Sequence, residues 1–64
     1  PPSDEKSLLL RLTELVDQGL GDEEEAKGLM AQLLMVLGAG HPQLQRLQRS
    51  IARQQWLKGL DAKQ

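Results

Sequence analysis

The chain has 64 residues and a net charge of −1 at pH 7, with one histidine and no cysteine. A chain this short forms at most one domain, and such a domain buries only about 60% of its unfolded-chain surface. The missing cysteines exclude disulfides and thiolate metal sites, and a lone imidazole cannot build a zinc site. We therefore expect one domain, residues 1–64, without cofactor or metal, held by dense helix packing, self-association or a partner.

The composition predicts an all-α fold. Leucine is abundant, Phe and Tyr are absent and there is one Trp, and such a leucine-rich chain poor in β-branched residues favours helix over strand. No apolar run approaches the ~20 residues of a membrane span. The absence of cysteine permits a cytoplasmic or nuclear location and fixes neither. Because the chain opens with two prolines rather than Met, we expect it to be a fragment of a longer protein.

A first helix is predicted over residues 4–18. At about 100° per residue, five apolar side chains fall within an arc of about 120°: Leu8, Leu9, Leu12, Leu15 and Val16. Ser3 or Asp4 can cap its start, and Gly19 suits the left-handed C′ position, with Leu20 following in a Schellman motif. Leu10 lies on the opposite face, beside Glu14 and Asp17.

A second helix is predicted over residues 22–37. Asp22 and Glu25 have the spacing of a capping box, and the acidic run between them suits the positive end of a helix. We interpret this run as a capped first turn; the alternative is an acidic docking patch or cation site. Apolar residues span about 160° of this helix: Ala26, Leu29, Met30, Leu33, Leu34, Val36 and Leu37. Met35 lies opposite them with small residues, which indicates a central helix.

A third helix is predicted over residues 42–59, with His41 as its cap and Pro42 at the first position. Its apolar pattern changes halfway. Leu44, Leu47 and Ile51 share one face, whereas Trp56 and Leu60 lie about 120–180° round from Leu44, with Leu57 further on. Either the helix bends or ends near residues 50–53 and returns the second set to the core, or it offers that set to a partner or second copy, or this stretch is a frayed tail.

Charge is divided between the two halves of the chain. Residues 1–37 carry eight acids and three bases, a net of −5, and residues 38–64 carry five bases and one acid, a net of +4. Arg46, Arg49 and Arg53 form one basic stripe near Trp56. By default we expect this stripe to be a solvated face that pairs loosely with the acids of the first two helices. The acidic half of one copy could also face the basic half of another.

The fold predicted from these elements is a small three-helix bundle, completed by dimerisation or by a partner. No catalytic constellation is present, so we expect a non-enzymatic protein–protein interaction, adaptor or oligomerisation module. The expected partner-binding residues lie mainly on the third helix: Trp56, Leu57, Leu60, Arg46, Arg49 and Arg53, with Leu10 and Met35 as further candidates. Trp is favoured as an anchor because it buries a large area at little entropic cost.

Two alternatives remain open. A helix, a Gly-containing turn and a Gln/Arg-rich helix resemble a helix-turn-helix, which implies nucleic-acid binding through the third helix, although the pI of about 5.7 makes nucleic acid the less favoured partner. Leu44, Gln45 and Arg49, with the later Leu57, resemble an IQ motif, which implies capture by a calmodulin-type protein. Ser50 departs from that pattern, and so does Gln54, which stands where a second basic residue is expected.

Overall fold

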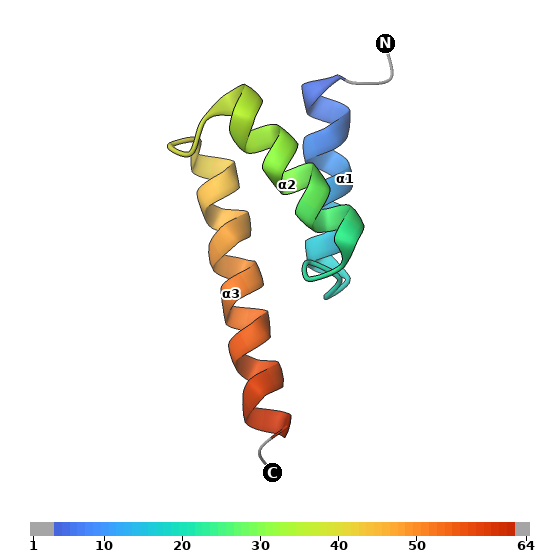
Figure 1. The fold of residues 1–64 in the computed structure, drawn as a ribbon, viewed down its shortest axis with the longest axis vertical. Coiled ribbons are helices and arrows are strands. Elements are labelled where there is room, and N and C mark those ends of the chain that lie inside the picture. Colours follow the sequence, from blue (N-terminus) through green and yellow to red (C-terminus); the bar gives the residue numbers. More distant parts are fainter. Residues whose placement is uncertain (1–3, 63–64) are drawn as a thin grey trace.

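The computed structural model describes residues 4–62 and, among their side chains, those of residues 4–60. This part of the chain forms three helices and no strand: α1 (Glu5–Asp17), α2 (Glu24–Leu37) and α3 (Pro42–Ala62). The all-α three-helix bundle predicted from the sequence is confirmed. In Figure 1, α1 and α2 lie against each other, and α3 packs against both and extends beyond them. None of the helices in the described part is long and apolar enough to cross a membrane.

The end of α1 is the predicted Schellman motif. Gly19 has a φ of 78°, the left-handed region that suits glycine. The N–H of Leu20 donates to the Leu15 carbonyl at 2.8 Å, and the N–H of Gly19 donates to the Val16 carbonyl at 3.0 Å. At the other end Asp4 stands at the N-cap without a side-chain capping bond, and Ser3 lies outside the described residues.

The capping box predicted for α2 is wrong. The helix begins at Glu24, Glu23 occupies the N-cap and no side chain caps the turn. The Asp22 carboxylate instead accepts a hydrogen bond from Lys58 Nζ of α3 at 3.1 Å. Glu25 accepts a bidentate pair from Arg11 of α1, at 2.9 Å from Nε and 3.1 Å from Nη2. Charge-assisted bonds to these cations replace the weaker bonds to backbone amides.

A glycine ends α2, and the start of α3 follows the sequence expectation. Gly38 has a φ of 88°, and its N–H donates to the Leu34 carbonyl at 3.0 Å. Pro42 opens α3 at the position where a missing N–H is no loss. His41 Nδ1 accepts the Gln43 N–H at 3.3 Å, so this histidine is the cap of α3, as predicted.

The core lies where the three helices cross. Its buried side chains are Leu12, Leu15, Val16, Ala26, Met30, Leu33, Leu44 and Leu47. Burying a side chain of this kind contributes about 1.5–3 kcal/mol. The contribution of α3 comes from its first half, where Leu44 and Leu47 are buried and Ile51 is half-buried against the cluster. Val36, expected within the apolar arc of α2, is instead exposed.

The second half of α3 neither bends back nor ends early. The helix runs without interruption to Ala62, three residues past the predicted end. Strong helix formers fill this stretch, and Gly59 weakens the helix without ending it. Beyond Ile51, the side of α3 that faces the bundle is polar. Gln54 Nε2 donates to the Val16 carbonyl at 2.9 Å, and Lys58 Nζ donates to the Asp22 carboxylate. The expectation of a bend or end near residues 50–53 is therefore wrong.

Candidate protein-docking surface

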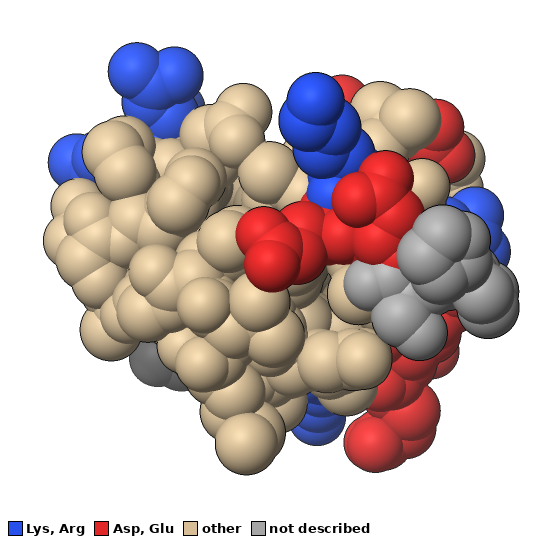
Figure 2. All heavy atoms as spheres, turned by 90° about the horizontal axis from the view of Figure 1, so that it is seen from above, with Lys and Arg blue, Asp and Glu red and all other residues tan. Residues whose placement is uncertain are grey.

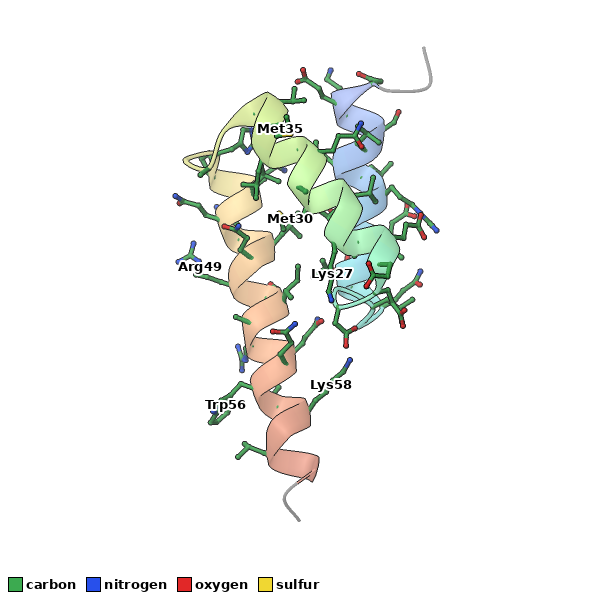
Figure 3. All side chains as sticks on the ribbon, viewed as in Figure 1. Lys27, Met30, Met35, Arg49, Trp56 and Lys58 are labelled. Carbon is green, nitrogen blue, oxygen red and sulfur yellow. The ribbon has the colours of Figure 1, made fainter. Side chains whose placement is uncertain are left out.

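The side of α3 that faces away from the core carries the residues that the sequence singled out. At about 100° per residue, six side chains share an arc of about 100°, opposite the core-facing positions. We call this set the outer face of α3: Arg46, Arg49, Arg53, Trp56, Leu57 and Leu60. In Figure 3, Arg49 and Trp56 project from α3 away from the other two helices, whereas Lys58 projects toward the turn between α1 and α2.

The C-terminal half of the outer face is apolar and uncovered. Trp56 is 64% exposed, Leu57 45% and Leu60 42%. The prediction that these side chains return to the intramolecular core is wrong, because Gln54 and Lys58 occupy the positions of α3 that face the bundle there. A tryptophan with most of its surface in water can bury a large area against a partner without first leaving the core.

The N-terminal half of the outer face is basic. Arg46, Arg49 and Arg53 are exposed, and in residues 4–60 the ion pairs are Arg11–Glu25, Lys27–Glu24 and Lys58–Asp22. The expectation that the arginines pair with acids of the first two helices is therefore wrong within that range. The reason is geometric, since α3 turns Lys58 toward the acidic turn and the arginines to the opposite side.

The two other candidate anchors lie in separate places. Leu10 is 61% exposed on α1, beside the exposed Glu14 and Asp17. Met35 is 88% exposed near the end of α2, and Figure 3 shows it at the opposite end of the molecule from Trp56. The structure therefore does not combine the predicted anchors into one patch. It gathers six on α3 and leaves Leu10 and Met35 apart.

Ion pairing shifts the pKa of two carboxyl groups. The hydrogen bond from Lys58 lowers the pKa of Asp22, and the hydrogen bond from Arg11 lowers the pKa of Glu25 and is accompanied by a raised pKa of Arg11. Seen from above in Figure 2, the acidic side chains lie mainly on the side of the molecule that carries α1, and much of the other visible surface is uncharged. Within the described residues no group of three or more His, Cys, Asp or Glu side chains could hold a metal.

A groove between α2 and α3 is a feature that the sequence reasoning missed. It encloses about 350 Å³, and its apolar lining includes Met30, Ala31, Leu34, Ile51 and Ala52. The small side chains at 31 and 52 leave this space open. The sequence shows a small residue on each of the two helices, but only the packing angle of the helices decides that these residues face each other.

Capture of α3 by a calmodulin-type protein requires a change in the core. Leu44 has no exposed surface and Leu47 is 9% exposed, and both belong to the buried cluster. An IQ-like capture would need Leu44 to leave this cluster. The outer face of α3 requires no such rearrangement.

Comparison with known proteins identifies no relative of this chain. No family model matches the chain. No curated protein and no solved structure matches it significantly.

Proposed function

We propose that this domain is a non-enzymatic protein–protein interaction module that docks through the outer face of α3. The observation that carries the proposal is the exposure of Trp56, Leu57 and Leu60 in line with three arginines that pair with no described acid. Tryptophan is among the residue types that concentrate binding energy in protein interfaces.

The two halves of the face have different roles. Burial of the tryptophan and the two leucines supplies most of the affinity, because the free energy of association comes mainly from apolar anchors that leave water. The arginines select an acidic partner, orient it and raise the rate of encounter, since exposed charges contribute little affinity of their own.

The rest of the bundle holds this face in place. The Gln54 side chain ties α3 to the end of α1 at 2.9 Å, and Lys58 ties it to the turn after α1 at 3.1 Å. A helix already fixed before binding loses less conformational entropy when it docks.

The experiment compares the wild-type domain with Trp56→Ala and with Val36→Ala, a control that removes an exposed apolar side chain from α2. Proteins retained by the immobilised domain are identified, purified and titrated against each form by calorimetry. Trp56 is the only aromatic residue, so its fluorescence reports directly on the outer face of α3.

We expect the purified partner to shift Trp56 emission to shorter wavelength. Trp56→Ala should weaken binding about 30-fold, which corresponds to an anchor of about 2 kcal/mol, and Val36→Ala should not. Equal binding by all three forms would show that the partner uses another surface and would reject the proposal.

A further inference from the structure

The exposed side of α1 carries a pattern that complements the outer face of α3. We call it the outer face of α1: Leu10, Glu14 and Asp17, all exposed. Neither acid belongs to an ion pair among residues 4–60. On α1 an apolar side chain is thus followed by two acids. On α3 the order is the inverse, because two arginines precede the exposed apolar side chains.

The spacings match when the two helices run antiparallel. On α1 the steps from Leu10 to Glu14 and then to Asp17 are four and three residues, and on α3 the steps from Leu57 back to Arg53 and then to Arg49 are four and four. Placing Leu10 opposite Leu57 sets Glu14 opposite Arg53. It brings Asp17 within one residue of Arg49, an offset of about 1.5 Å along the axis.

A parallel alignment lacks this match. With Leu10 again opposite Leu57, the two acids would align beyond residue 60, away from Arg49 and Arg53. The antiparallel register alone satisfies the apolar and the charged positions together.

The two faces cannot meet within one chain. The outer face of α3 points away from the other helices, as Arg49 and Trp56 show in Figure 3. The outer face of α1 lies opposite the side that carries the buried Leu12 and Leu15. Since each face lies opposite the core-facing side of its own helix and its side chains are exposed, each is open to another molecule.

We propose that the outer face of α3 docks antiparallel on the outer face of α1 of a second copy of this chain. The inference rests on the proposed function and names its partner. Such a contact joins two different surfaces, so it either closes into a ring or extends head to tail. Leu10 covers Trp56 and Leu57, while the acid–arginine pairs set the register.

A second copy suits this face better than a membrane. An interfacial membrane helix carries its apolar stripe along its whole length with cations beside it. On α3 the arginines and the apolar side chains instead follow one another along the same stripe. The partner that matches this order is a helix on which charged and apolar side chains also follow one another along one stripe, as they do on α1.

The test uses charge reversal with the full 64-residue chain. One variant carries Arg49→Glu and Arg53→Glu, and a second carries Glu14→Arg and Asp17→Arg. All four sites are exposed, and circular dichroism checks that each variant stays helical. Gln32→Arg and Gln32→Glu, which add charge to an exposed position of α2, serve as controls. Sedimentation over a wide range of protein concentration gives the mass of each form.

We expect the wild type and the Gln32 variants to grow in mass with concentration, with Trp56 emission moving to shorter wavelength. Each double reversal alone should weaken this association at least tenfold, and an equimolar mixture of the two should restore it. Leu10→Ala, which changes no charge, should weaken it as well.

A wild type that stays monomeric throughout, or a mixture of reversals that does not recover, would overturn the second-copy inference. A monomer that binds anionic vesicles instead would also overturn it. If a purified protein other than this chain still bound in a manner that Trp56→Ala abolished, the proposed function would stand and only its assignment to a second copy would fall.

Discussion

Replacing Gly21 with alanine should destabilise the bundle through one contact with α3. Gly21 is buried in the turn between α1 and α2, and a Cβ there would lie 2.7 Å from Ile51 Cγ1 and 3.4 Å from Cδ1. Favourable carbon–carbon separations are about 3.5–4.0 Å. Because isoleucine is branched at Cβ, its Cγ1 cannot move away without changing a stiff χ1 angle.

The expected free-energy change combines two opposing effects. Overpacking of this kind costs about 1–3 kcal/mol. Alanine also reduces the conformational entropy of the unfolded chain, which stabilises the folded protein by about 0.4–1 kcal/mol. This gain applies at Gly21 because, among the described residues, positive φ occurs only at Gly19 and Gly38. With the midpoint of each range the net loss is about 1.3 kcal/mol. Each kcal/mol lowers Tm by about 4–8 °C in a domain of this size.

Thermal unfolding followed by circular dichroism measures this loss. The matched control is Gly28→Ala in α2, where an added Cβ meets nothing within 4 Å, so we expect stabilisation by about 0.5–1 kcal/mol. In an Ile51→Ala background the Gly21 substitution should become neutral or slightly stabilising. A Gly21→Ala protein as stable as the wild type, or an equal loss in both backgrounds, would refute the contact as the cause.

Three further outcomes are expected. Gln54→Ala should lower the free energy of unfolding by about 0.5–1.5 kcal/mol in urea titration, because it removes the bond to the Val16 carbonyl; no change would contradict that tie. Asp22→Asn should lower Tm at pH 7 but progressively less below the ordinary carboxyl pKa of 3.8, since Lys58 lowers the folded-state pKa of Asp22 and its contribution is lost on protonation. A Tm difference that persists to pH 2 would contradict this assignment. Trp56 in dilute protein should be quenched by acrylamide almost as readily as free tryptophan, and strong protection would contradict its exposure.

The ends of α1 and α2 and the start of α3 were predictable because local backbone rules set them. Gly19 and Gly38 adopt the positive φ that side chains resist, and Pro42 opens α3 where its missing N–H is no loss. The capping box failed for a physical reason of another kind. Asp22 had a competing partner in Lys58, 36 residues away, and no local pattern reveals a bond of that range.

The candidate surface was only half predictable. The helical period shows that Arg49, Arg53 and Trp56 share a side of the third helix, but a periodic pattern cannot tell which side a neighbour covers. The groove beside Ile51 was missed for the same reason, because its volume depends on how far two helices separate.

From the sequence alone, this protein is a set of three helices with leucine stripes, an acidic first part and a basic third helix. Those features follow from propensity, periodicity and the local geometry of glycine and proline. Tertiary structure decided that α3 continues past its neighbours and turns Gln54 and Lys58 inward. Because α1 and α2 pack against one side of α3, Trp56 and the arginines on its other side remain on the surface.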